Sequence, residues 1–130
     1  MPDNTITPAS IAPWLSVNDS AKAVSFYKAA FNAIETYRLE DPDGNAVVKL
    51  SVGDSVFWVS DAADKSNEPE NVGGNTVRMI LTVSDPDTMF KTALAAGAVE
   101  VFPVSEAHGW RLGRLIDVCG LHWEIGKQLG

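Results

Sequence analysis

The chain is short of several features that define whole classes of protein. Its 130 residues include a single cysteine, Cys119, so neither an internal disulfide nor a multi-thiolate metal site can form. No apolar run approaches the about 20 residues that a membrane-spanning helix needs. The first residues also lack the basic start and apolar stretch of a signal peptide. We therefore expect a cytoplasmic protein with no membrane partner.

Positive charge is scarce as well. Ten Lys and Arg stand against seventeen Asp and Glu, which gives a formal net charge of -7. Binding to a phosphate backbone relies on a cationic surface, so the composition argues against a nucleic-acid partner. The same acidity would attract a cationic small molecule, although ordinary solubility also accounts for it.

The residues that are present predict one globular domain over residues 1–130. Hydrophobic residues make up 45% and charged residues 21%, which is close to the average for proteins with a buried core. Alternation and apolar periodicity predict the elements of the first half. They are strands at about 11–17, 35–39, 46–52 and 55–60, and a helix over 20–31 that Asn18 and Asp19 cap and Asn32 ends.

The same pattern restarts after a stretch with almost no large apolar residue, which we interpret as a linker over about 62–75. Asp85 and Pro86 then provide the cap and first residue of a helix that Gly97 stops. Strands are predicted at about 76–83, 99–104, 111–116 and 122–126. Two βαβββ modules result, at about 7–61 and 76–128.

An internal repeat supports this division. The segments Leu15-Ser-Val-Asn-Asp19 and Leu81-Thr-Val-Ser-Asp85 superimpose at an offset of 66 residues. A curved sheet with one helix across its outer face leaves its inner face uncovered. We therefore expect an α+β fold in which paired, curved mixed sheets surround a concave trough, with the helices outside and any ligand in the trough.

One segment near the end of the chain carries a more specific signal. It runs from Gly109 to Glu124 and resembles the Gly-x-Arg-x-Gly-x-x-x-Asp-Pro-x-Gly ending of small bacterial members of the glyoxalase/bleomycin-resistance/dioxygenase superfamily, also called vicinal oxygen chelate (VOC) proteins. Val118 stands where that ending has proline and Cys119 where it has phenylalanine. The paired modules extend the resemblance over nearly the whole chain.

The resemblance implies four positions at which relatives bind a metal ion. Counting back from each helix cap and aligning the last strands places Ala12, Trp58, Arg78 and Glu124 there. Of these only Glu124 can coordinate a divalent cation, because the other three offer no lone pair to a metal. We therefore expect no cofactor and no metal site, with Glu124 as a ligand only if a metal is present.

The same positions suggest a ligand-binding trough instead. Side chains alternate across a strand, so Trp14 should share the trough face with Ala12, and His122 should share it with Glu124. The candidate ligand-binding residues are Trp14, Trp58, Arg78, His122 and Glu124. Three alternatives remain open: the two indoles are core residues, Arg78 and Glu124 form a structural ion pair, or His122 acts as a general base. No residue is assigned a catalytic role.

The leading functional hypothesis is binding or sequestration of a small aromatic or cationic molecule by a metal-free protein of the bleomycin-resistance type. One alternative is a metal-dependent lyase, isomerase or dioxygenase that uses Glu124 and His122. Another is a module whose trough is filled by its own side chains. Open sheet edges and a short trough wall also predict a homodimer with two equivalent clefts.

Overall fold

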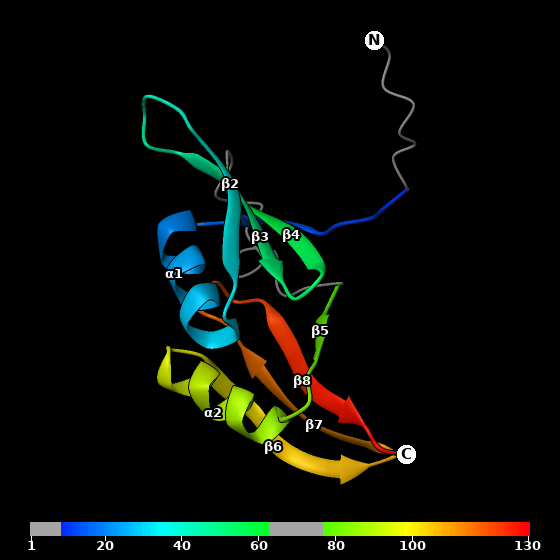
Figure 1. Cartoon of the computed structure of the whole chain (residues 1–130). Coiled ribbons are helices and arrows are strands. Elements are labelled where there is room, and N and C mark those ends of the chain that lie inside the picture. The colour runs from blue at the N-terminus through cyan, green and yellow to red at the C-terminus, as the bar shows by residue number, and fades with distance from the viewer. Residues whose placement is uncertain (1–8, 63–76) are drawn as a thin grey trace.

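Two modules with the same order of elements make up the protein, as a computed structural model shows for residues 9–62 and 77–130 (Figure 1). Module one contains β1 (Trp14–Val17), α1 (Ser20–Phe31), β2 (Ile34–Glu40), β3 (Ala46–Val52) and β4 (Ser55–Asp61). Module two contains β5 (Met79–Thr82), α2 (Pro86–Ala95), β6 (Val99–Ala107), β7 (Trp110–Ile116) and β8 (His122–Gln128). The predicted linker and the predicted start of module one lie almost wholly outside the described residues. No helix in the described part of the chain is long and apolar enough to cross a membrane.

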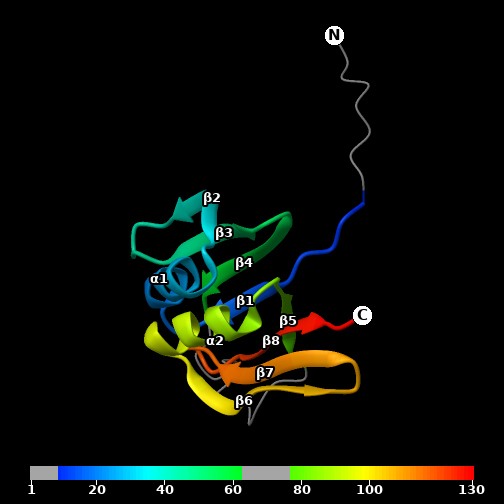
Figure 2. The same cartoon turned by 60° about the horizontal axis from the view of Figure 1, so that its bottom comes forward.

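Each module forms one four-stranded mixed sheet, in the order β1-β4-β3-β2 or β5-β8-β7-β6. The first strand of each module pairs in parallel with the last, and the other neighbours are antiparallel. The helices lie outside the sheets and next to each other (Figures 1 and 2). The predicted α+β class with two βαβββ modules is therefore confirmed.

Local capping explains why both helices begin where the sequence predicts. The Asp19 carboxylate accepts a hydrogen bond from the Lys22 amide, and Asp85 does the same for Thr88. At the end of α1, Asn32 adopts the left-handed conformation with φ 57°, and its amide bonds the carbonyl of Tyr27. These local hydrogen bonds fix where both helices begin and where α1 ends, independently of tertiary packing.

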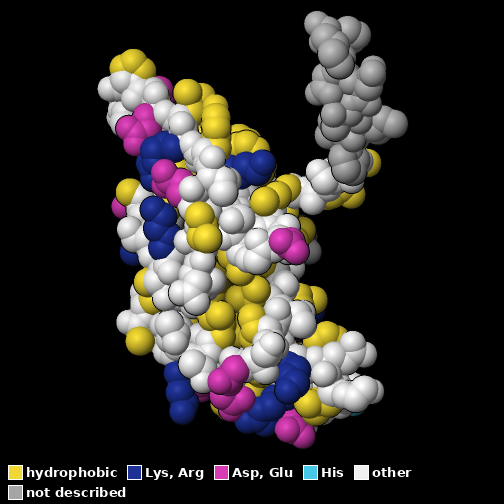
Figure 3. Space-filling view, in the orientation of Figure 1, with side chains coloured by type: hydrophobic (Ala, Val, Ile, Leu, Met, Phe, Trp, Pro, Cys, Tyr) yellow, Lys and Arg dark blue, Asp and Glu magenta, His cyan; other side chains and the backbone are white. Residues whose placement is uncertain are grey.

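An aromatic cluster joins the two modules at the core. Tyr27 and Phe31 of α1 contact Trp123 of β8, with ring centroids 5.6 Å and 4.8 Å apart. Phe57 of β4 also meets Trp123, at 5.9 Å. All four side chains are buried. In the space-filling view, hydrophobic side chains gather in a band between the modules, and most charged groups lie above and below that band (Figure 3).

A buried carboxylate lies at the same junction. One oxygen of Asp117 accepts hydrogen bonds from the Tyr27 hydroxyl (2.5 Å) and the Trp123 indole (2.8 Å). The other accepts from the amides of Cys119 and Leu121. Burial and the neighbouring Asp117 raise the pKa of Tyr27 well above its usual value, so the hydroxyl stays protonated and donates. Asp117 therefore ties α1 to the turn between β7 and β8.

Candidate functional site

The inner face of module two is defined by strand alternation. On β8, Trp123 and Ile125 are buried against the helices, so His122, Glu124 and Gly126 point the other way. The register then extends this face sideways. Glu124 pairs with Ile80 of β5 and with Arg114 of β7, and Gly126 pairs with Leu112 of β7.

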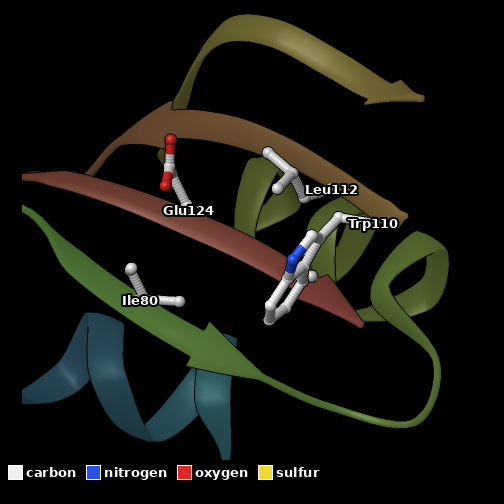
Figure 4. Close-up of a pocket in the computed structure, with 5 residues that line it drawn as sticks. Ile80, Trp110, Leu112 and Glu124 are labelled. Atoms are coloured by element: carbon white, nitrogen blue, oxygen red, sulfur yellow. The ribbon is translucent and has the colours of Figure 1, made fainter. Parts of the chain in front are cut away.

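A pocket of about 270 Å³ opens on this face, lined by Ile80, Trp110, Leu112, Glu124 and Gly126. Figure 4 shows the four larger side chains projecting from β5, β7 and β8 around one space. The lining is apolar apart from the Glu124 carboxylate. A second pocket of about 250 Å³ shares Trp110 and Leu112 and extends toward β6. The two pockets together make a continuous apolar surface on both sides of these two residues.

Gly126 has no side chain, which lets β8 lie close to β7 and leaves the pocket above it open. A Cβ atom at this position would lie 2.6 Å from Cβ of Leu112 and 3.1 Å from the carbonyl oxygen of Arg111. Neither atom is the end of a flexible side chain, so any larger residue would push β8 away from β7. Gly126 is thus required by the strand pairing that forms the pocket floor.

Basic groups gather at one end of the pocket. Arg114 Nε donates a hydrogen bond to His122 Nδ1 at 3.1 Å. Arg78 immediately precedes Met79, whose partner on β8 is Trp123, so the register places Arg78 beside His122. Burial and then the charges of Arg114 and Arg78 lower the pKa of His122. The imidazole is therefore neutral near pH 7, and because Nδ1 accepts, the proton resides on Nε2.

The Glu124 carboxylate makes no hydrogen bond or ion pair with any described residue, and neither does the guanidinium of Arg78. The alternative in which these two residues form a structural ion pair is therefore not what the structure shows. A half-buried carboxylate without a partner in an apolar pocket is open to a donor from a ligand.

The inner face of module one carries a different group, which we call the indole stack: Trp14 and Trp58. Their rings lie 5.7 Å apart and nearly parallel, at 19°. Trp14 Nε1 donates to the hydroxyl of Ser60 at 2.8 Å, Lys49 Nζ lies 5.4 Å from the Trp58 centroid, and Tyr37 meets Trp58 edge-on. Trp14 is 54% exposed, so it is not an interior core residue.

The five residues proposed from the sequence thus fall into two groups. Trp14 and Trp58 form the indole stack, whereas Arg78, His122 and Glu124 lie together on module two. No hydrogen bond, ion pair or ring contact between described residues joins the two groups. Sequence reasoning missed Trp110, Leu112 and Arg114, although alternation along β7 could have indicated Leu112 and Arg114. Trp110 was missed because the predicted strand began one residue later.

Comparison with known proteins shows which fold the chain shares. No family model matches it. An uncharacterised protein of Mycobacterium bovis is 36% identical over 127 residues, which cover 92% of this chain and 84% of that protein. The crystal structure of TioX from Micromonospora sp. ML1 is 27% identical, with a TM-score of 0.72 over 94% of this chain and 100% of that one. A glyoxalase/bleomycin resistance protein/dioxygenase family enzyme from Burkholderia phytofirmans is 19% identical and has the same fold, with a TM-score of 0.72 over 89% and 95% of the two chains. The chain has the fold of the glyoxalase/bleomycin-resistance/dioxygenase superfamily.

The metal positions that the superfamily implies do not hold a suitable donor set in this chain. Trp58 is engaged with Trp14, Ala12 has no donor atom, and the Arg78 guanidinium is cationic. Within residues 9–62 and 77–130, no group of three or more His, Cys, Asp or Glu side chains is placed to hold a metal ion. One carboxylate, Glu124, is too few ligands for a divalent site.

Proposed function

We propose that the protein binds and sequesters a small molecule with a planar apolar part, without a metal, in the pocket around Glu124 and Trp110. The observation that carries the proposal is the Glu124 carboxylate, which has no partner among residues 9–62 and 77–130 and lies in an otherwise apolar pocket. Ligand sites in proteins have this composition, with mostly hydrophobic and aromatic lining and a few polar groups that orient the ligand.

The chemistry of the lining indicates what such a ligand offers. The indole of Trp110 supplies a flat apolar surface on one side of the pocket, and the Glu124 carboxylate on the other side favours an ammonium or another donor group. At about 270 Å³, the pocket is near the small end of the range for ligand sites, which begins at about 300 Å³. A ligand with one or two rings fits this space.

A bleomycin-resistance type of sequestration accounts for these features better than metal-dependent catalysis. The superfamily fold supports small-molecule binding in general, and members often form dimers. A lyase, isomerase or dioxygenase of the metal-dependent type would need a metal site, and among the described residues Glu124 alone does not provide one. We place this binding role in the cytoplasm, in keeping with the composition.

We also propose that the protein works as a homodimer. Both inner faces expose large apolar side chains, which soluble monomers seldom leave in one area. On module one these are Trp14, Ile34, Tyr37 and Leu39, and on module two Ile80, Val99 and Phe102. A second copy that presents its module-one face to module two would therefore cover both surfaces.

A ligand titration, repeated on a variant whose larger side chain fills the pocket, tests the binding role. Phenethylamine, an aromatic amine, should perturb the amide resonances of Ile80, Leu112 and Gly126 in a two-dimensional NMR titration. Leu112→Trp should weaken that binding by about tenfold or more, because the larger ring occupies the ligand's space. Val101→Trp, on the neighbouring strand β6 and outside the pocket lining, is the control and should bind like the native protein.

Two outcomes would contradict the proposal. Equal binding by the Leu112→Trp variant would show that the ligand lies elsewhere. A rise in melting temperature on adding zinc or manganese, lost in Glu124→Ala, would favour the metal-dependent alternative, since a ligand that binds only the native state must stabilise it.

A further inference from the structure

The arginines of this protein divide into two kinds. Arg38 contacts Glu35 and Glu40, and Arg111 contacts Asp87 at 2.6 Å, so both are paired with carboxylates. Arg78 and Arg114 have no carboxylate partner among the described residues. Both of these guanidiniums lie near His122, at the same end of the pocket. In a chain with a net charge of -7, two arginines on one face without a carboxylate partner in the described segments mark a local site for negative charge.

His122 completes this basic end, which consists of Arg78, Arg114 and His122. Because Nδ1 accepts from Arg114, the Nε2–H group of the neutral imidazole is a donor with no partner among the described residues. The two guanidiniums and this imidazole N–H group therefore lie together, and apart from the Arg114–His122 bond their donors have no acceptor among the described residues. A carboxylate or another oxyanion is the group that such a set of donors recognises best.

Glu124 sets a second requirement. It follows His122 by two residues on β8, so about 7 Å separates their Cα atoms. An anionic group placed directly on Glu124 would be repelled, whereas an ammonium or hydroxyl would supply its missing donor. Along β8 the face thus presents donors, then an acceptor, then the apolar pocket over Gly126.

We infer that the ligand is amphoteric: an oxyanion binds the basic end, an ammonium or other donor binds Glu124, and an apolar body lies between Ile80, Trp110 and Leu112. A free apolar amino acid, or a molecule built like one, has these three parts in this order. The inference rests on the proposed function and adds to it the chemical class of the ligand.

A matched set of three probes tests each part separately. Phenylalanine carries both charged groups, phenethylamine lacks the carboxylate, and 3-phenylpropionate lacks the amine. In calorimetric titrations of the native protein, phenylalanine should bind about tenfold more tightly than either of the other two. Each missing group removes one charge-assisted contact, so the single-group probes should bind with similar, weaker affinity.

Two charge-neutralising variants should then separate the contacts. Arg78→Gln should weaken phenylalanine and 3-phenylpropionate by about fivefold or more and leave phenethylamine unchanged. Glu124→Gln should weaken phenylalanine and phenethylamine and leave 3-phenylpropionate unchanged or tighter. Lys91→Gln on α2 and Glu100→Gln on β6 change the net charge by the same amounts at exposed sites, and should bind all three probes like the native protein.

The outcomes distinguish this inference from the proposed function. If phenethylamine binds as tightly as phenylalanine and Arg78→Gln has no effect, the basic end binds no anion and the inference is wrong. The proposed binding role is still supported in that case if Leu112→Trp weakens the binding of phenethylamine. If either variant weakens all three probes equally, its residue has only a structural role and the amphoteric ligand is wrong. If none of the probes binds, both proposals fail.

Discussion

Neighbouring residues of the segment from Gly109 to Glu124 do different work because they alternate across strands. Arg111 and Gly113 face the helix side, where Arg111 pairs with Asp87 of α2 and Gly113 lies against Phe90. Leu112 and Arg114, between and after them, face the pocket side. Arg111 and Gly113, which belong to the motif behind the family resemblance, therefore have structural roles. Their neighbours Leu112 and Arg114 are the residues proposed to contact the ligand.

His122 gives a residue-level prediction about pH. Its pKa is lowered in the folded protein by burial, Arg114 and Arg78, with Asp117 opposing the shift, whereas an unfolded histidine titrates near about 6.5. The unfolded state therefore binds the proton first as the pH falls. This contribution to stability is present above about pH 6.5 and is lost as the pH falls through the folded pKa.

Urea unfolding between about pH 7.5 and pH 5 measures this effect. We expect His122→Gln to lose part of the decline in the free energy of unfolding that the native protein shows over this range. His108→Gln, at an exposed turn position, should keep the native profile. Parallel profiles for the native protein and His122→Gln would show that the imidazole is not destabilised by its neighbours.

At the scale of elements, Asp117 holds α1 against the turn between β7 and β8. Its four accepted hydrogen bonds require both carboxylate oxygens to act only as acceptors. In Asp117→Asn, the amide oxygen can still serve one pair of donors. The amide nitrogen must then face the donors of the other pair, which leaves buried groups unsatisfied.

Asp117→Asn should therefore lower the free energy of unfolding by about 2–3 kcal/mol. Chemical denaturation measures the change, and Asp54→Asn in the exposed turn before β4 is the matched control. Replacing Trp123 by Phe removes the indole donor. In a double-mutant cycle, the loss from Asp117→Asn should then be smaller in the Trp123→Phe background. Equal losses in both backgrounds would rule out the proposed clash of donors.

The elements were largely predictable from sequence, and the site only in part. Asp19 and Asp85 as caps, Asn32 as a stop and clear alternation gave both helices and all eight strands to within a few residues. Alternation along one strand also placed His122 and Glu124 on the inner face. Alternation along β7 could have placed Leu112 and Arg114 on the same face, but which residues of β8 they lie beside depends on the pairing of β7 with β8, and a single sequence does not specify that register.

At the scale of the whole molecule, no element of the described part of the chain covers the two apolar inner faces, which predicts association of two chains. Light scattering at micromolar concentration should give a mass of about twice the 14.0 kDa of the chain. Trp14→Glu places a charge on the module-one face and should shift the protein toward monomer, because burying an unpaired carboxylate is costly. Lys91→Glu, on the outer helix, should leave the mass unchanged. A native mass near 14.0 kDa would refute the dimer.

The offset of 66 residues extends to the inner faces of the two sheets. Trp14, Trp58 and Ser60 of module one correspond to Ile80, Glu124 and Gly126 of module two, in the same strand register. In the first copy, two stacked rings and a hydroxyl fill these positions with protein atoms. In the second copy, the same positions border open space. Because the two halves differ at these positions, substitutions on module two can change the molecule that its pocket holds while the indole stack of module one stays the same.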